Sequence, residues 1–369
     1  MRVAPQVLIA GAGPTGLAAA LFLSRRGVVV RIVDAAEIPT ATSKALGVNP
    51  RTLDLLEDTG VTARLLAEAQ TVARLHIHRH GRTLAEVHLG DLDLSARFPL
   101  AILPQARTEA LLSEALAARG VMVERDLALT GLSQDADAVT AVLSSGERVR
   151  IPLLFAADGA HSTARKALSL GFPGDAWAEP WQLIDVDMDG PPSDEAWIDF
   201  RDDALFVCLP YSGARFRLIG FGPPLLDNLP EGWRAGAVRW RSDFHISHRM
   251  ASAMSVGRVA LGGDAAHIHS PIGARGMNLG IEDAFVFADC AAGFLSGQLE
   301  RIEDYDQLRR PVDKAVVRHV RALTSFVRNT GAGADLARRA VIPIAARLPF
   351  LIERVARIGL GLDHPVRLR

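Results

Sequence analysis

The sequence is poor in cysteine, and the two cysteines it has lie far apart. Its 369 residues include Cys208 and Cys290 and no CxxC pair. This excludes a disulfide framework, a cysteine-ligated zinc site and a dithiol redox centre. Such sparing use of cysteine is typical of the reducing cytoplasm, and we expect a cytoplasmic protein.

A charge excess and long apolar runs are also absent. The chain carries 41 lysines and arginines against 42 acidic residues, a net charge of −1. Without a basic surface field, neither nucleic acid nor an anionic membrane is an expected partner. No apolar run approaches the roughly 18 residues that cross a bilayer, so we expect no integral membrane segment. Regularly spaced glycines interrupt the apolar N-terminal stretch, which we do not interpret as a signal peptide.

A glycine-rich turn follows the first apolar segment. Residues 6–10 ("QVLIA") predict a buried strand, 14–26 a helix, and 27–34 a second, parallel strand. The glycines between the first strand and the helix have the GxGxxG spacing of a dinucleotide-binding turn: Gly11, Gly13 and Gly16. They allow a tight turn, close approach of the backbone to a pyrophosphate, and close packing of helix on strand.

Residues beside the turn strengthen this prediction. Pro14 and Thr15 open the helix, whose N-terminal amides and partial positive charge attract phosphate. Asp34 ends the second strand, where it can accept hydrogen bonds from a ribose diol. The alternative is a tight structural turn without a ligand. The motif alone fits NAD or FAD, and the lack of a second strand–GxGxxG–helix unit argues against a reductase with two nucleotide domains.

A second glycine-rich turn lies more than two hundred residues later. Residues 259–284 contain a strand, Gly-Gly-Asp, a loop with three more glycines and a helix, which suggests a second grip on one long ligand. Between the two turns, "AWIDFR", "ALFVCLP" and "RFRLIGFG" predict an antiparallel sheet. Alternation over 74–90 predicts a hairpin around Gly81 and Arg82. Residues 107–120 predict an amphipathic helix, and helical patterns prevail from 279 onward.

Three motifs together resemble the class A flavoprotein monooxygenases, whose fold is typified by para-hydroxybenzoate hydroxylase. They are the GxGxxG turn with Asp34, the segment "AADGAHSTAR" (156–165), and the segment from Gly263 to Ala284. The resemblance spans about residues 5–320. It implies an α/β fold: a Rossmann-like FAD-binding domain with an inserted, mainly antiparallel β domain for the substrate, and C-terminal helices. The implied boundaries are 1–75, 98–172 and 250–310 for the FAD-binding domain, 76–97 and 173–249 for the substrate-binding domain, and 311–369 for the helical segment.

The resemblance also implies where FAD binds. Asp264 would accept a hydrogen bond from the ribityl chain, and the loop 271–278 would run beside the isoalloxazine ring. The following helix would point its N-terminus at the pyrimidine side, where it stabilises the negative charge of reduced flavin. Beyond the first turn, the implied cofactor-binding residues are Lys44, Gln105, Asp158, Gly263, Asp264, Pro271, Gly273, Gly276, Met277 and Asn278. Ordinary structural roles are the alternatives: a helix cap for Asp264, a strand-end turn for Asp158 and a solvated amide for Gln105.

Two positions depart from the family pattern. Lys44 stands where the family commonly has arginine, which keeps the charge but loses the bidentate fork. Arg275, in Gly-Ala-Arg-Gly, stands where the family usually has glutamine. Arg275 can hold the negative charge of the flavin, contact a substrate carboxylate or point to solvent.

The implied chemistry is hydroxylation of an aromatic or phenolic small molecule. NAD(P)H would reduce FAD, and O2 would form a flavin C4a-hydroperoxide that transfers the hydroxyl group. A monomer or a homodimer would suffice. The same fold also carries Baeyer–Villiger-type oxygenation and prenyl or other FAD-dependent reduction, and a non-catalytic FAD-binding regulatory protein is a further alternative.

No base can be assigned from the sequence. The catalytic residues stay unassigned, with Arg275, His245 and Tyr211 as candidates. Arg215 and Arg217 alternate onto one strand face, where we favour solvent exposure over lining the pocket. His267 is expected to be a packed structural histidine. No metal site is predicted, because the histidines of "HIHRH" (76–80) lack placed carboxylates. Residues 311–363 are expected to pack on the body of the protein, with a dimer contact or a membrane surface as alternatives.

Overall fold

The structure is a computed structural model that describes residues 4–41, 45–328 and 332–368. Strand β1 (Val7–Ala10), helix α1 (Pro14–Arg25) and strand β2 (Val30–Val33) form its first unit. β1 and β2 run parallel, with Val7 opposite Val30. This confirms the predicted βαβ unit around the first glycine turn.

A six-stranded sheet is assembled around β1 from separated parts of the chain. Its order is β18 (Ser255–Val256), β19 (Val259–Leu261), β12 (Leu153–Ala156), β1, β2 and β8 (Val123–Glu124). The pairs from β19 to β8 are parallel, and β18 pairs antiparallel with β19. Every residue of β1, β12 and β19 is buried, as expected for parallel strands covered on both faces.

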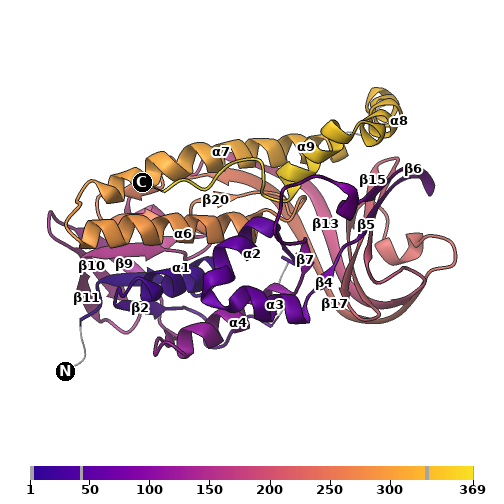
Figure 1. Ribbon diagram of the computed structural model, residues 1–369. Coiled ribbons are helices and arrows are strands. Elements are labelled where there is room, and N and C mark those ends of the chain that lie inside the picture. The colour runs from indigo at the N-terminus through magenta and orange to yellow at the C-terminus, as the bar shows by residue number, and fades with distance from the viewer. Residues whose placement is uncertain (1–3, 42–44, 329–331, 369) are drawn as a thin grey trace.

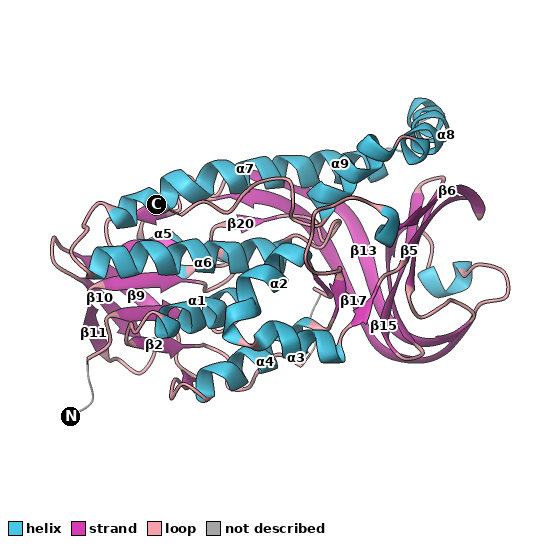
Figure 2. Cartoon of the chain, in the orientation of Figure 1, coloured by secondary structure: helices cyan, strands magenta, loops and turns pink. Residues whose placement is uncertain are grey.

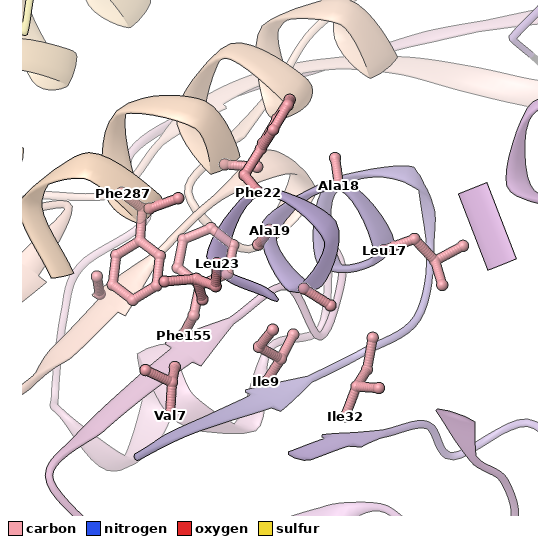
Figure 3. Packing of buried hydrophobic residues seen from close by; sticks show 14 of the residues in the cluster. Val7, Ile9, Leu17, Ala18, Ala19, Phe22, Leu23, Ile32, Phe155 and Phe287 are labelled. Carbon is pink, nitrogen blue, oxygen red and sulfur yellow. The ribbon is translucent and has the colours of Figure 1, made fainter. Parts of the chain in front are cut away.

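Long helices cover this sheet (Figure 2). They are α1, α4 (Gln105–Ala117), α6 (Gly276–Leu295) and α7 (Arg301–Arg328). Figure 3 shows α1 packed over Ile9 of β1, with Phe287 of α6 beside Phe155. The rings of Phe155 and Phe287 stack with their centroids 4.3 Å apart. Because β19 and α6 flank the second glycine turn, this core brings both turns to the same end of the sheet.

Smaller elements surround the parallel sheet. One antiparallel sheet consists of β9 (Leu129–Gln134), β10 (Val139–Leu143) and β11 (Arg148–Ile151). Another consists of β3 (Gly47–Val48), β7 (Ala101–Ile102) and β4 (Gln70–Thr71). The short helical elements are α2 (Pro50–Leu56), η1 (Glu57–Thr59), α3 (Val61–Glu68), η2 (Leu89–Asp91), α5 (Thr163–Ala167), η3 (Leu225–Asn228) and η4 (Gly263–Ala265).

An eight-stranded sheet forms the other half of the molecule (Figure 1). Its order is β20 (His267–Ile268), β17 (Arg234–Met250), β13 (Gly174–Asp189), β16 (Arg215–Phe221), β15 (Ala204–Ser212), β14 (Glu195–Arg201), β5 (Arg74–Arg79) and β6 (Arg82–His88). All neighbours are antiparallel except β14 and β5. The hairpin at Gly81 and the mainly antiparallel sheet are thus confirmed.

The C-terminal part is helical. α7 runs without a break across residue 311 and contains Pro311. Helices α8 (Ala332–Arg347) and α9 (Pro349–Gly359) follow it, and Figure 1 shows α8 beside the eight-stranded sheet, near β6. Among the described residues, no helix combines the length and apolar character that crossing a membrane requires. The division into domains given above stays a prediction.

Candidate active site

The first glycine turn is fixed by contacts between backbone atoms. Gly11 has φ +99°, and a Cβ there would lie 2.1 Å from the carbonyl oxygen of Ala157. A Cβ on Gly16 would lie 1.9 Å from the carbonyl oxygen of Gly11. A Cβ on Gly13, in contrast, would meet no atom within 4 Å. Gly11 and Gly16 are therefore required by the fold, whereas Gly13 faces open space next to Pro14, where α1 begins.

Asp34 lies against this turn. Its Oδ2 accepts a hydrogen bond from the amide of Ala12 at 2.5 Å, and its Oδ1 accepts one from Ala36 at 2.8 Å. The guanidinium of Arg125 lies 3.4 Å from Oδ1. The acid predicted to bind a ribose therefore stands beside the glycines predicted to bind a pyrophosphate, although its contact with ribose stays a prediction.

Gln105 begins α4 and bonds to its neighbour one turn later. Its Nε2 donates to Oε1 of Glu109 at 2.8 Å. Glu109 is only 6% exposed, and burial raises its pKa. Sequence reasoning missed Glu109, which shows in the sequence only as one more charge on an amphipathic helix.

Asp158 follows β12 and has one carboxylate oxygen without a partner. Its Oδ2 accepts hydrogen bonds from the amides of Thr163 and Ala164, at 2.7 and 3.1 Å. Its Oδ1 is buried and has no hydrogen-bond partner among the described residues. A buried oxygen of this kind calls for a donor that the chain does not supply, such as a hydroxyl of a bound cofactor.

Side chains tie the three motifs together. The hydroxyl of Thr15, in the first turn, packs against Gly263 and Gly280 of the second motif. A Cβ on Gly263 would lie 2.5 Å from this hydroxyl oxygen, and a Cβ on Gly280 would lie 2.2 Å from it. Arg165, in the middle motif, donates from Nη1 to the carbonyl oxygen of Ala265 at 2.8 Å. The turns that are distant in sequence thus meet in space, around the carboxyl ends of β1, β12 and β19.

The loop 271–278 joins this junction to the eight-stranded sheet. Gly273 and Ala274 both have left-handed backbones, with φ of +82° and +51°. Asn278 is fully buried, and its Nδ2 donates to the carbonyl oxygens of Gly47 and Ala274 at 3.0 and 2.5 Å. The predicted residues Pro271, Gly276 and Met277 lie in the same loop and the first turn of α6, and Asp264 is exposed in η4. Lys44 lies outside the described residues.

A group of buried charges stands behind the second turn. Nε2 of His267 lies 2.7 Å from Oδ2 of Asp283, which also accepts the amide of Gly263 at 3.0 Å. Arg309 donates to Asp283 and to Asp313, both at 2.8 Å. Burial opposes the imidazolium, but the carboxylates of Asp283 and Asp313 raise the pKa of His267 to about 9. The possible ligand atoms of His267, Asp283 and Asp313 all lie within 4.8 Å of one another, and Arg309 donates to both carboxylates.

The sheet face beside the loop carries Tyr211 and a buried ion pair. Arg217 is 1% exposed, and its Nε and Nη2 donate to Asp185 at 2.7 and 2.8 Å. The expected solvent exposure of Arg217 is wrong, because Asp185 stands directly opposite on β13 and compensates its charge. The guanidinium carbon of Arg217 lies 5.3 Å from the ring centre of Tyr211. Burial and Asp185 raise the pKa of Tyr211.

The other two catalytic candidates lie elsewhere. His245 is exposed on β17, between the buried Phe244 and Ile246, so it points to the opposite face of the sheet from them. Arg275 is 1% exposed and lies 3.6 Å from Asp363. Of the three alternatives for Arg275, pointing to solvent is therefore wrong.

These residues fit a long dinucleotide such as FAD. The open side of Gly13 leaves room for a pyrophosphate, and the buried Oδ1 of Asp158 lacks a donor. The N-terminus of α6 lies at the end of the loop 271–278, and α6 packs against α1, which begins at the first turn. Asp34, Asp158, Asp264 and the two turns would hold the cofactor.

Comparison with known proteins agrees with this reading. The FAD binding domain family matches residues 4–227 and 231–320. The 6-methylpretetramide 4-monooxygenase of Streptomyces rimosus is 34% identical over 391 aligned positions, covering 98% of this chain and 70% of that protein. The anhydrotetracycline hydroxylase structure from Streptomyces rimosus is 29% identical with a TM-score of 0.79, over 98% of this chain and 77% of that one.

One further structure shows the fold alone. The p-nitrophenol 4-monooxygenase of Pseudomonas putida DLL-E4 is 21% identical, with a TM-score of 0.88 over 98% of this chain and 99% of that one. The resemblance drawn from the three sequence motifs is confirmed. The chain belongs to the class A FAD-dependent aromatic monooxygenases, enzymes that take their reducing electrons from NAD(P)H.

Proposed function

We propose that this enzyme hydroxylates a phenolic ring of a multi-ring aromatic molecule, using NAD(P)H and O2. The substrate would lie between the loop 271–278 and the eight-stranded sheet. Reduced FAD, when bound, supplies the activated oxygen. A cytoplasmic location is supported by the two unbridged cysteines, and either a monomer or a homodimer contains all the residues used.

One observation carries the proposal. Ile272, in the loop beside the expected flavin ring, packs against a cluster of large apolar residues on one face of the sheet. That cluster contains Trp177, Trp181, Leu183, Phe200, Leu205, Phe221, Phe244 and Ile246 of the sheet, together with Val327 of α7. An aromatic wall next to the reacting end of the cofactor favours flat, apolar substrates and excludes water. The relatives named for a pretetramide and an anhydrotetracycline support substrates of several rings.

Tyr211 is the residue we assign to the substrate's phenolic oxygen. It lies at the junction of this sheet with Leu46 and Leu100, which border the loop. A tyrosine hydroxyl is protonated near neutral pH, so Tyr211 can donate a hydrogen bond to a phenolate and hold it in place. The Arg217–Asp185 pair beside it supplies a fixed dipole in a buried setting.

The proposal is tested with FAD-loaded protein, NADH or NADPH, and ¹⁸O2. Tetracyclic phenols should gain one ¹⁸O on a ring carbon, and single-ring phenols should react more slowly. A ring-expanded ester would instead indicate Baeyer–Villiger oxygenation, and a saturated product without ¹⁸O would indicate a reductase. Bound FAD that NAD(P)H does not reduce under any of these conditions would favour the regulatory alternative.

Substitution separates Tyr211 from His245. Tyr211→Phe should lower kcat/KM roughly 10- to 100-fold, because one positioned hydrogen-bond donor to a charged oxygen is lost. His245→Gln should leave it within about twofold, because the side chain faces solvent. Equal effects of the two changes would contradict the assignment of Tyr211.

A further inference from the structure

The chain returns to the flavin loop after α9. The return segment, residues 360–366, runs back along α6 and α7, as the yellow trace in Figure 1 shows. Arg51 of α2 donates to the carbonyl oxygens of Gly361 and His364, at 3.2 and 2.6 Å. Gly361 has φ +74°, and a Cβ there would lie 2.5 Å from Nη1 of Arg275 and from Nδ2 of Asn49. The segment is therefore held by its backbone against the start of α6.

Two charges of the return segment face two buried charges of α6 and its preceding loop. Oδ1 of Asp363 lies 3.6 Å from Nη2 of Arg275, and Nε2 of His364 lies 2.8 Å from Oε2 of Glu282. Arg275 is 1% exposed and Glu282 is fully buried. Nδ1 of His364 also lies 3.0 Å from Asp363, so the two pairs are joined. Removing one partner of such a pair leaves an unpaired buried charge, which lowers the stability of the folded protein. The buried charges of α6 and its preceding loop therefore depend on the return segment.

The direction of the Arg275 side chain rests on Asp363. None of its three guanidinium nitrogens makes a hydrogen bond with the described residues, and the carboxylate of Asp363 is its ion-pair partner. Arg275 directly follows the left-handed Ala274 and precedes Gly276, where α6 begins. His319 of α7 also lies near Asp363, at 3.7 Å, but its side chain is 41% exposed, so its ion pair with Asp363 is weaker than the buried pair with Arg275.

We propose that Asp363 is a positioning residue of this monooxygenase: it acts through Arg275 to fix the loop 271–278 and the positive charge at the N-terminus of α6. His364 anchors Asp363 by pairing with Glu282. The effect on the flavin rests on the proposed function, because that end of α6 is expected to face the pyrimidine side of the ring. A cation held there stabilises the negative charge of reduced flavin.

The test is a double-mutant cycle with Asp363→Asn and Arg275→Met. Hydrogen exchange is measured in the FAD-free protein, and the ratio of oxidised to reduced FAD is measured against a reference dye in the loaded protein. Asp363→Asn should speed exchange of the amides of 272–278 by about tenfold and shift the ratio of oxidised to reduced FAD at least about threefold. In the Arg275→Met background, both effects should shrink below about twofold.

Glu353→Gln is the matched control, since Glu353 lies on α9 and accepts the amide of Asp93 at 3.3 Å. It should change neither readout. The proposal is overturned if Asp363→Asn leaves exchange at 272–278 unchanged, raises it equally in β1 and β12, or acts as strongly without Arg275. If Asp363→Asn does not fold, Asp363→Glu enters the same cycle. Failure of the protein to bind FAD would overturn the proposed function, while exchange in the FAD-free protein would still decide the role of Asp363.

Discussion

The glycine-turn junction and the aromatic face of the eight-stranded sheet are built in different ways. At the junction, backbone atoms pack directly on backbone atoms: Gly16 packs on the carbonyl group of Gly11, and Gly11 packs on the carbonyl group of Ala157. On the sheet, side chains pack on side chains around Trp181, with one buried ion pair at Arg217. Backbone contacts accept no larger residue, whereas a packed apolar face accepts many combinations of similar volume. The first region therefore reveals the cofactor, and the second can change with the substrate.

Gly16→Val should give the largest effect, because it forces a side chain into the junction. Its Cβ would lie 1.9 Å from the carbonyl oxygen of Gly11 and 3.3 Å from Ile9. We expect a loss of more than about 5 kcal/mol in unfolding free energy, enough to abolish the folded state. Circular dichroism and the yield of monodisperse protein measure this.

Gly13→Ala is the control, because it sits in the same motif and faces open space. The melting temperature of the FAD-free protein should stay the same, while FAD affinity should fall at least about tenfold, since the methyl group occupies the place of the pyrophosphate. Unchanged affinity would show that this side of the turn does not hold the cofactor.

Asp185→Asn tests the sheet side of the comparison. It leaves the guanidinium of Arg217 buried without its carboxylate, and we expect a loss of about 3–5 kcal/mol in denaturant unfolding. Asp187→Asn, two residues along the same strand, affects pairs with Arg215 and Arg239 that are far more exposed, and should cost much less. Similar losses at both positions would mean that burial does not govern these pairs.

A pH titration gives the smallest expected effect, and it concerns the charges behind the junction. The pKa of His267 is raised to about 9, above the ordinary value for histidine. The protonated His267 therefore stabilises the folded protein fully below about pH 6.5, and this stabilisation is lost as the pH rises through 9. The raised pKa of Asp313, which burial favours, acts in the same direction. Between pH 7 and 10 the unfolding free energy should fall in both the unchanged protein and the His267→Gln variant. The fall should be larger in the unchanged protein by on the order of 2 kcal/mol. Parallel curves for the two proteins would refute this role.

Local patterns predicted much of the fold. The βαβ unit, the hairpin at Gly81 and the antiparallel strands after residue 172 follow from spacing and alternation, which are properties of neighbouring residues. The parallel pairing of β14 with β5 did not show in the sequence, because it joins segments more than one hundred residues apart. The continuity of α7 through Pro311 also depends on packing, since proline alone favours a break.

The glycine spacing by itself determined that a dinucleotide binds, because a glycine needed for close backbone approach cannot be replaced. The choice of FAD over NAD came from the resemblance of three motifs to a known family. Only the tertiary structure decided which arginines are buried. Arg217 is paired with Asp185, Arg309 with Asp283, and Arg275 with Asp363. An arginine looks the same in the sequence whether it is solvated or buried. What fixes its state is a carboxylate delivered by a distant segment, which offsets the cost of removing the charge from water.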